Sequence, residues 1–252
     1  MNIEFSGKTV IVTGAAHGFG RAIAQAFASR GARVHVCDIN EAGLAQTVAL
    51  CGQSTVAHAL DVGDRSAVQA TVAKIEAADG AVDILVNNAG GVCGQVGQPI
   101  EDISERDWQT IFDVNLSGAF FMTQAVAPIM KKHKFGRVIN ISSGAGLGVS
   151  LTGIQAYASA KAGQIGLTRQ LAHELGPWNI TVNNVAPGFV LSNPTTERQW
   201  RAMGADGQKS LLDSIALKRL GKPDDIANMV LFFASNHAQW ISGQVISVDG
   251  GK

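Results

Sequence analysis

Short runs of apolar, β-branched residues alternate along this chain with longer segments in which apolar residues recur at helical spacing. The first run covers residues 9–12 and leads directly into a glycine cluster. Residues 21–29 then repeat apolar positions every three to four residues, and Gly31 follows as a stop signal. A continuous apolar run of this kind predicts a strand that is buried on both faces, followed by a helix.

The same alternation continues to the end of the chain. Further strands are expected at residues 33–37, 55–60, 84–86, 137–141, 181–185 and 244–248, and further helices at 66–78, 105–130, 156–175 and 223–234. Strands that alternate with long helices predict right-handed βαβ units and a parallel sheet with helices on both faces. We therefore expect an α/β chain, 1–252, that forms a single doubly wound Rossmann domain with about seven strands.

One stretch breaks the alternation. Between Gly188 and about Leu217 the chain carries Asn193-Pro194 and two further glycines without a clear strand or helix period. A segment this long inside a compact domain usually has a function. We expect a substrate lid at about 189–217.

Composition narrows the classes of partner. Apolar residues make up 46% of the chain, and 20 basic residues balance 20 acidic ones without a basic tract. These values favour a buried core and give no electrostatic reason to expect nucleic acid or a membrane surface as partner. No apolar window approaches the roughly 20 residues of a membrane span, and residues 1–8 do not resemble a signal peptide. Three widely spaced cysteines fit neither disulfides nor a metal site, so we expect free thiols, no metal and a cytoplasmic location.

The glycine cluster after the first strand predicts a phosphate-binding loop. Residues 13–20 read TGAAHGFG, with the spacing G-x-x-x-G-x-G between a strand and a helix. Glycine lets the backbone approach a pyrophosphate, whose charge then lies at the positive end of the helix. The expected cofactor contacts are Gly14, His17, Gly18, Phe19 and Gly20.

Two acidic residues at strand ends sharpen the choice of cofactor. Asp38 ends the second strand, where a carboxylate can accept from the ribose hydroxyls of adenosine and would repel a 2′-phosphate. His17 provides no permanent positive charge for such a phosphate. The predicted cofactor is therefore NAD. Asp61 and Val62 follow the third strand and are expected to hold the adenine ring.

The predicted catalytic residues lie around one helix start. Tyr157 and Lys161 stand four residues apart, which places them on the same helix face. An ammonium beside the phenol, together with the positive nicotinamide, would lower the Tyr157 pKa toward the working range. Ser142 and Ser143 follow an earlier strand, where a hydroxyl can donate to a reacting carbonyl oxygen.

Taken together, these motifs resemble the short-chain dehydrogenase/reductase family. The chain carries, in the family's order, the glycine loop, Asn87-Asn88-Ala89-Gly90, Asn115, Ser143, Tyr157-x-x-x-Lys161, Pro187-Gly188 and the closing Val248-Asp249-Gly250-Gly251. The resemblance covers essentially the whole chain. It implies an NAD-dependent oxidoreductase that interconverts a secondary alcohol and a ketone.

The resemblance also implies a role for each matching residue. Tyr157 is the general acid/base, and Lys161 lowers its pKa and holds the nicotinamide ribose. Ser143 orients the substrate, and Asn115 holds a water that links Lys161 to solvent. Asn87 mainly stabilises the sheet. The remaining expected cofactor contacts are Asn88, Ala89, Gly90, Tyr157, Lys161, Pro187, Gly188, Val190 and Ser192. The interval between serine and tyrosine is one residue longer than is commonest in the family, so Ser142 remains an alternative to Ser143.

The substrate is predicted from the residues expected to line the site. Gln95, Ser143, Gln155 and Tyr157 are the expected contacts of a small-molecule substrate. Ser150, Thr152 and the lid cations Arg198, Arg201 and Lys209 add polarity. This polarity favours a sugar, polyol or sugar acid, whose carboxylate an arginine could bind through two hydrogen bonds.

Two alternatives stay open. A 3-oxoacyl-thioester reductase would share every motif, although biosynthetic reductases of the family usually take NADPH, which Asp38 disfavours. A non-catalytic NAD-binding regulator is the second alternative, and such proteins normally lose the tyrosine or the lysine.

The resemblance further implies a homotetramer. The segments 105–130 and 156–175 resemble the helix pair of the main dimer interface in the family, and residues 249–252 resemble a segment at the other interface. The second helix has a small-residue face (Ala156, Ala160, Gly163, Leu167) that permits close packing with another helix, although the same face could pack on its own sheet.

Overall fold

The chain folds around one seven-stranded parallel sheet. The computed structural model describes residues 3–252, and its strands lie in the order β3-β2-β1-β4-β5-β6-β7. The strands are β1 (Thr9–Thr13), β2 (Arg33–Asp38), β3 (Thr55–Ala59), β4 (Ile84–Asn87), β5 (Gly136–Ile141), β6 (Ile180–Pro187) and β7 (Val245–Val248). The order reverses between β1 and β4, so this sheet has the doubly wound topology that the alternation of elements predicts.

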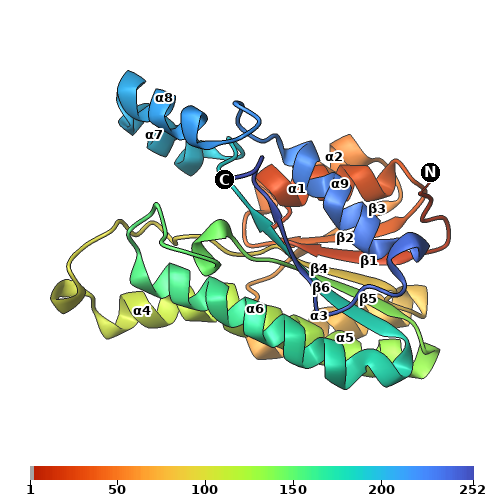
Figure 1. The fold of residues 1–252 in the computed structure, drawn as a ribbon. Helices are drawn as coiled ribbons and strands as arrows, with labels where there is room; N and C mark the ends of the chain where they lie inside the picture. The colour runs from red at the N-terminus through yellow and green to blue at the C-terminus, as the bar shows by residue number, and fades with distance from the viewer. Residues whose placement is uncertain (1–2) are drawn as a thin grey trace.

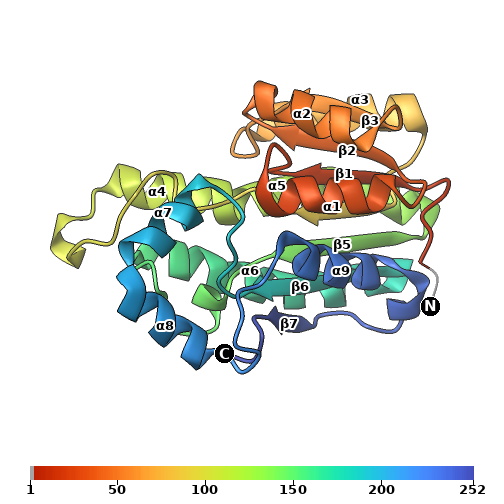
Figure 2. The same cartoon turned by 90° about the horizontal axis from the view of Figure 1, so that it is seen from above.

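Helices cover both faces of the sheet. Figures 1 and 2 show α1, α2 and α9 over one face and α3, α5 and α6 over the other, with α7 and α8 standing apart at one end. The helices are α1 (Gly18–Ala28), α2 (Glu41–Cys51), α3 (Arg65–Asp79), α4 (Glu105–Phe112), α5 (Gly118–His133), α6 (Gln155–Leu175), α7 (Pro194–Ala202), α8 (Gly204–Ser214) and α9 (Pro223–Ala234). Short 3-10 turns cover Ile100–Asp102, Gly144–Gly146, Gly176–Trp178 and Asn236–Ala238.

Burial follows the position of each strand in the sheet. Every residue of β1, β4, β5 and β6 is buried, whereas most residues of the edge strands β3 and β7 are half-buried or exposed. Two apolar clusters fill the space between the sheet and its two helical layers. The continuous apolar runs in the sequence are therefore the strands that both layers cover.

The structure differs from the predicted elements in three places. The single helix expected at residues 105–130 consists of α4, a π-helical turn η2 (Asp113–Ser117) and α5. Helix α2 was not predicted, although Asn40 caps it by accepting from the Gly43 backbone N–H. The irregular stretch 189–217 contains α7 and α8, because Asn193 and Pro194 start a capped helix there.

Across residues 3–252, no helix is long and apolar enough to cross a bilayer.

Candidate active site

The loop after β1 is packed so closely that three of its positions have no space for a side chain. Gly14 has a φ of +64°, and a Cβ there would lie 2.7 Å from the Ala89 Cα. A Cβ on Gly20 would lie 2.2 Å from the Gly14 carbonyl oxygen, and one on Gly18 would lie 2.9 Å from the Ser192 oxygen. The three glycines therefore bring the loop, the end of β4 and the start of the 189–217 segment into direct backbone contact.

The loop opens helix α1 with unused donors. His17 is the N-cap residue, and among the described residues its side chain makes no capping hydrogen bond. The first turn of α1 carries no acidic residue. A helix start of this kind leaves backbone N–H groups and partial positive charge available to an anion.

Asp38 is held facing this loop. One of its carboxylate oxygens accepts from the Ala16 backbone N–H at 3.0 Å, and the other accepts from the Asn40 N–H at 2.9 Å. The side chain is half-buried at the end of β2, next to β1. Both hydrogen bonds fix the negative charge at the mouth of the glycine loop.

Arg21, a cation close to the loop in sequence, is already bound by the protein. Its guanidinium donates to Thr47 Oγ1 at 3.0 Å, to Gln46 Oε1 at 3.0 Å and to the Ala16 carbonyl oxygen. It therefore ties α1 to α2 and to Ala16, the loop residue whose N–H binds Asp38.

A threonine and an asparagine join the ends of β1 and β4. Thr13 Oγ1 accepts from the backbone N–H groups of Asn88 and Ala89, both at 3.0 Å. The Asn88 amide donates to the carbonyl oxygens of Thr13 and Gly14 at 2.9 and 3.0 Å. Asn88 thus positions the glycine loop with its side chain, and the backbone of Asn88 and Ala89 packs against that loop.

Tyr157 lies at the first turn of α6, beside Ser143. Burial raises the Tyr157 pKa above its ordinary value, and the hydrogen bond with the Ser143 side chain opposes that rise. The sequence led us to expect that Lys161 lowers the Tyr157 pKa. Burial has the larger effect on this pKa, because the Lys161 ammonium lies 5.8 Å from the centre of the tyrosine ring. Desolvation of the phenolate form outweighs the more distant charge.

Ser143 and Ser142 have different environments. Ser143 is half-buried, and its Oγ accepts from the Ala145 N–H at 3.1 Å. Ser142 is buried, and its hydroxyl donates to the Asn184 side chain inside the sheet. The geometry therefore associates Ser143, rather than Ser142, with Tyr157.

Lys161 is buried behind Tyr157. Its Nζ donates to the Ile141 carbonyl oxygen at 2.9 Å and contacts Gln164 Oε1 at 3.4 Å. A Cβ on Gly90 would lie 3.0 Å from this nitrogen. Burial lowers the Lys161 pKa to about 7, and the Cys93 thiol nearby acts in the opposite direction. The ammonium therefore lies at the junction of β4, β5 and α6 and can gain or lose its proton near neutrality.

Asn115 anchors the loop after β4. It lies in the π-helical turn, is fully buried, and exchanges hydrogen bonds of 2.9 Å with both the N–H and the carbonyl group of Gly91. Its amide also donates to the Ile111 carbonyl oxygen at 2.9 Å. The side chain therefore holds the Gly90–Gly91 backbone against the lysine, and π-turns commonly occur at such functional positions.

The end of β6 forms the opposite wall of the site. A Cβ on Gly188 would lie 2.7 Å from the Asp249 backbone, and Val190 is buried and pairs with Gly221. Pro187 is the last residue of β6, and the Ser192 N–H donates to Thr196 at 3.1 Å. These residues lead from the sheet into α7 alongside Gly18.

The predicted adenine contacts lie beyond β3. Asp61 is exposed, and its Oδ1 accepts from the Gly63 N–H at 2.8 Å. Val62 is buried, and a Cβ on Gly118 would lie 2.6 Å from its Cγ2. Asp61 is thus placed at the surface while Val62 is part of the packing between this loop and α5.

The two predicted substrate glutamines each join a loop to a helix. The Gln95 amide donates to the Asp107 carbonyl oxygen at 2.7 Å, and the Gln155 amide donates to the Gln98 carbonyl oxygen at 3.1 Å. Ser150 and Thr152 bond to each other at 2.7 Å. The polar groups expected to face a substrate therefore spend much of their hydrogen-bonding capacity on the loops themselves.

Exposed apolar side chains that the sequence reasoning missed lie on the two loops that precede α4 and α6. Val149 is fully exposed, and Val96 and Leu151 are exposed to 77% and 65%. They lie on the loops after β4 and β5, which touch where a Cβ on Gly97 would meet the Thr152 carbonyl oxygen at 2.9 Å. We call Val96, Leu147, Val149 and Leu151 the apolar rim. The alternation of apolar residues at 147, 149 and 151 in a glycine-rich loop was the available sequence signal.

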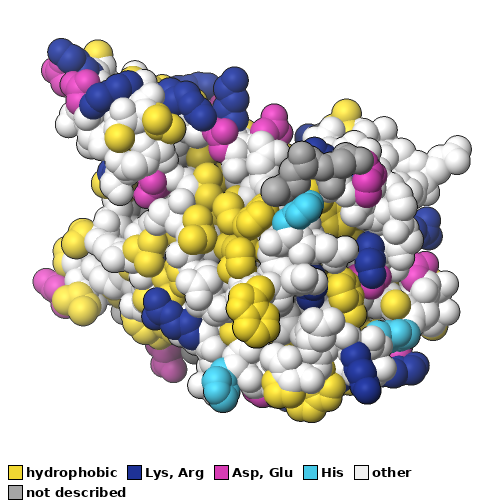
Figure 3. Space-filling model, turned by 45° about the vertical axis from the view of Figure 1, so that its right-hand side comes forward, with side chains coloured by type: hydrophobic (Ala, Val, Ile, Leu, Met, Phe, Trp, Pro, Cys, Tyr) yellow, Lys and Arg dark blue, Asp and Glu magenta, His cyan; other side chains and the backbone are white. Residues whose placement is uncertain are grey.

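The lid cations face solvent. Arg201 pairs with Glu197 at 3.4 Å, Arg198 donates to Thr195 at 3.1 Å, and Lys209 is exposed. In Figure 3 the side chains of both signs gather on this outlying part of the molecule, at the upper left. On the inner side, the rings of Phe189 and Trp200 lie 6.2 Å apart.

The residues fit a dinucleotide cofactor. The glycine loop excludes side chains, the start of α1 has free donors, and Asp38 is fixed at the end of β2 where a ribose would lie. Tyr157 and Lys161 lie at the carboxyl ends of β4 and β5, on the other side of the topological switch point.

Comparison with known proteins identifies the family. A family model described as enoyl-(acyl carrier protein) reductase matches residues 14–252. The chain is 38% identical to the 3-oxoacyl-(acyl-carrier-protein) reductase FabG of Thermotoga maritima, over 99% of both chains. It is 40% identical to the (2S)-[(R)-hydroxy(phenyl)methyl]succinyl-CoA dehydrogenase subunit BbsD of Thauera aromatica, over 97% of this chain and 96% of the other. A solved structure titled as a short-chain alcohol dehydrogenase from Sinorhizobium meliloti superimposes with a TM-score of 0.89 at 36% identity, covering 98% and 97% of the two chains. The chain belongs to the short-chain dehydrogenase/reductase family and is an oxidoreductase of that family.

Proposed function

We propose that this protein interconverts 3-oxoacyl and 3-hydroxyacyl thioesters with NAD(H). The observation that carries the proposal is the apolar rim, because exposed Val96, Val149 and Leu151 offer an apolar surface on the loop after β4 and on the loop between Ser143 and α6, the helix that carries Tyr157. Clustered exposed apolar groups often mark an interaction or ligand site. Two of the relatives are named for thioester substrates, one on acyl carrier protein and one on coenzyme A.

The rim favours a thioester over the sugar, polyol or sugar acid that the polar residues suggested. A polyol would need several free hydrogen-bonding groups, yet Gln95 and Gln155 use their amide nitrogens on backbone carbonyls. Arg201 is paired with Glu197 within α7. An acyl chain instead gains from covering apolar side chains. The family relationship likewise favours an enzyme over a non-catalytic regulator.

The proposed chemistry uses the tyrosine as acid and base. When bound, the reduced nicotinamide supplies the hydride for the substrate carbonyl carbon. The Tyr157 hydroxyl donates its proton to the carbonyl oxygen, and Ser143 donates a hydrogen bond to that oxygen. The Lys161 ammonium stabilises the phenolate that remains. In the oxidative direction the phenolate takes the hydroxyl proton back.

NAD is the proposed cofactor because of the charge at the end of β2. Asp38 accepts two backbone hydrogen bonds that hold its carboxylate beside the glycine loop. A 2′-phosphate at this point would face a fixed negative charge, whereas ribose hydroxyls would find an acceptor. Arg21, the cation nearest in sequence, is held by hydrogen bonds to Thr47 and Gln46. Asp61 is proposed to accept from the adenine amino group.

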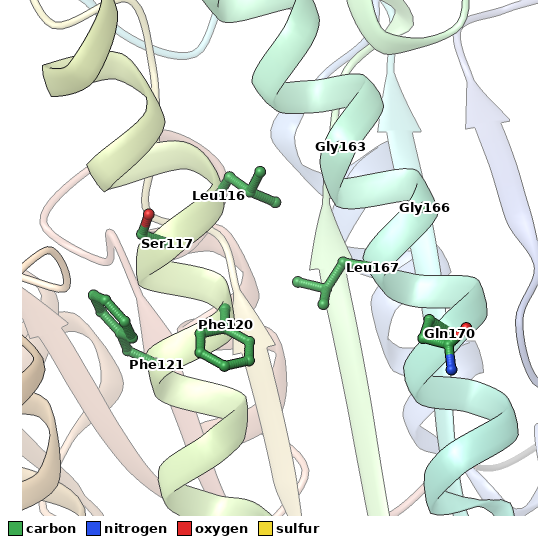
Figure 4. Close-up of a pocket in the computed structure, with 8 residues that line it drawn as sticks. All are labelled: Leu116, Ser117, Phe120, Phe121, Gly163, Gly166, Leu167 and Gln170. Carbon is green, nitrogen blue, oxygen red and sulfur yellow. The ribbon is translucent and has the colours of Figure 1, made fainter.

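We also propose a homotetramer whose main interface includes an apolar groove between α5 and α6. Leu116 and Leu167 point toward each other across this groove in Figure 4. Its lining consists of Leu116, Ser117, Phe120, Phe121, Gly163, Gly166, Leu167 and Gln170. Ala156 and Ala160 are instead buried within the chain against Ile111, so the small-residue face of α6 divides between core and surface. A monomeric mass in light scattering would contradict the assembly.

The first test is an initial-rate assay that follows the absorbance of reduced nicotinamide. Acetoacetyl-CoA and longer 3-oxoacyl-CoA esters would be offered with NADH and separately with NADPH, beside a panel of polyols and sugar acids. We expect turnover of the thioesters with NADH and a lower KM for the longer chains. Turnover of a polyol without turnover of any thioester would overturn the proposal, and preference for NADPH would overturn its cofactor.

A further inference from the structure

A buried glutamine lies one helical turn beyond the lysine of the site. Gln164 is fully buried on α6, three residues after Lys161. Residues at this spacing share a helix face, and Gln164 Oε1 lies 3.4 Å from the Lys161 Nζ. Neither the motif pattern nor the proposed function gives this residue a role.

The orientation of the Gln164 amide is fixed by its neighbour. An ammonium can only donate, so the amide must present its oxygen to Lys161. The Nε2 atom is then buried with no hydrogen-bond partner among residues 3–252. A buried unpaired N–H group costs stability that an apolar side chain would not. The contact between Gln164 Oε1 and Lys161 is therefore the one interaction that an apolar residue at this position could not make.

Two acceptors now hold one side of the ammonium. The Ile141 carbonyl oxygen at the end of β5 accepts at 2.9 Å, and Gln164 Oε1 on α6 is the second acceptor. An ammonium has three donors. The third N–H of the Lys161 ammonium is therefore directed toward Gly90, where an added Cβ would lie 3.0 Å from Nζ.

We propose that Gln164 is a positioning residue for Lys161: its side-chain oxygen favours the ammonium form of the lysine and directs the remaining N–H toward the cofactor site. The proposal rests on the nicotinamide site and on the proposed function. Tyr157 and Cys93 are the other titratable groups that face this lysine. A neutral oxygen in this position counteracts the lowering of the Lys161 pKa that burial causes.

The test is NADH affinity measured by fluorescence titration across pH, which needs no substrate. All variants carry Cys93→Ser so that the thiol does not titrate. We expect affinity to fall as Lys161 loses its proton. The fall has a midpoint pH. Gln164→Leu should move this midpoint to lower pH by about one unit, and Gln164→Glu should move it to higher pH by a similar amount. The alkaline limb of kcat/KM for acetoacetyl-CoA reduction should move in the same directions.

A matched variant separates positioning from packing. Thr168→Val removes hydrogen bonds to Asn140, Asn184 and the Gln164 backbone carbonyl oxygen in the same buried layer but leaves the Gln164 side chain and Lys161 in place, so its midpoint should match that of the Cys93→Ser parent. Coinciding midpoints for Gln164→Leu and the parent would overturn the inference. A downward shift in both Gln164→Leu and Gln164→Glu would also overturn it, since only lost packing would then be common to them. Failure of the parent to reduce acetoacetyl-CoA would overturn the proposed function, while the NADH titration would still decide the role of Gln164.

Discussion

The two halves of the site are built on different principles. Around β1, β2 and the start of α1, backbone and side-chain hydrogen bonds fix the glycine loop and Asp38, and glycine contacts leave no space for side chains. Around the loops after β4 and β5, by contrast, Val96, Val149 and Leu151 stand exposed without covering groups among the described residues. The first half is pre-organised for one rigid group, whereas the second presents an adaptable apolar surface. A substitution should therefore have different consequences in the two halves.

The largest effect is expected at Tyr157, where the two halves meet. Tyr157→Phe removes the proton donor and keeps the ring, so kcat/KM should fall by about 10²- to 10⁴-fold. The dissociation constant for NADH should change little, because the glycine loop and Asp38 are untouched. Parallel kinetics and NADH titration measure both quantities. Retention of most of the activity would show that the proton comes from another group.

The rigidity of the cofactor half can be tested at Gly20. In Gly20→Ala the new methyl group would lie 2.2 Å from the Gly14 carbonyl oxygen, so the loop must shift. We expect about 1–3 kcal/mol less stability in urea unfolding and at least about tenfold weaker NADH binding. Gly176→Ala is the matched control, because a Cβ there meets no described atom within 4 Å. Equal effects of the two substitutions would argue against a tightly packed loop.

A substitution of Asp38 tests whether charge selects NADH over NADPH in the same half of the site. Asp38→Ser removes the negative charge and keeps a small hydrogen-bonding group. The ratio of kcat/KM for NADH over NADPH should fall by about tenfold, since a difference of one fixed charge next to the 2′ position is worth on the order of 1.4 kcal/mol or more. An unchanged ratio would mean that residues other than Asp38 discriminate between NADH and NADPH.

The smallest effect is expected in the apolar rim. Leu151→Ser removes apolar surface without disturbing a hydrogen bond, so KM should rise about two- to tenfold for long 3-oxoacyl-CoA esters. The change for acetoacetyl-CoA should be smaller, because its acyl chain is too short to reach as much of the rim. KM values for the two esters with the wild type and the variant give the comparison. Equal changes for both esters would indicate a general disturbance of the loop.

The sequence predicted the sheet, most of its helices and the proximity of Ser143, Tyr157 and Lys161, because strands buried on both faces, helical periodicity and glycine turns leave strong local patterns. It missed α2, α7 and α8. It did not predict the π-turn at residues 113–117, since one extra residue barely alters helical periodicity. The contact between Gln164 and Lys161 was also missed, because a lone polar residue in an apolar helix pattern does not reveal its tertiary partner. The apolar rim was overlooked for a related reason: local spacing does not tell an exposed valine in a loop from a buried one.

The π-turn also has a consequence for insertions and deletions. It places one additional residue between α4 and α5, and the Asn115 amide reaches Gly91 from this wider turn. Removing one residue here would restore a regular helix but rotate α5 by about 100° relative to α4. Either Asn115 would lose its hydrogen bonds with Gly91, or the residues of α5 that face the sheet would turn away from the sheet. Length variation among natural relatives should therefore be rare within residues 113–117 and more frequent in the exposed loops at 91–100 and 147–153, where no helix phase must be kept.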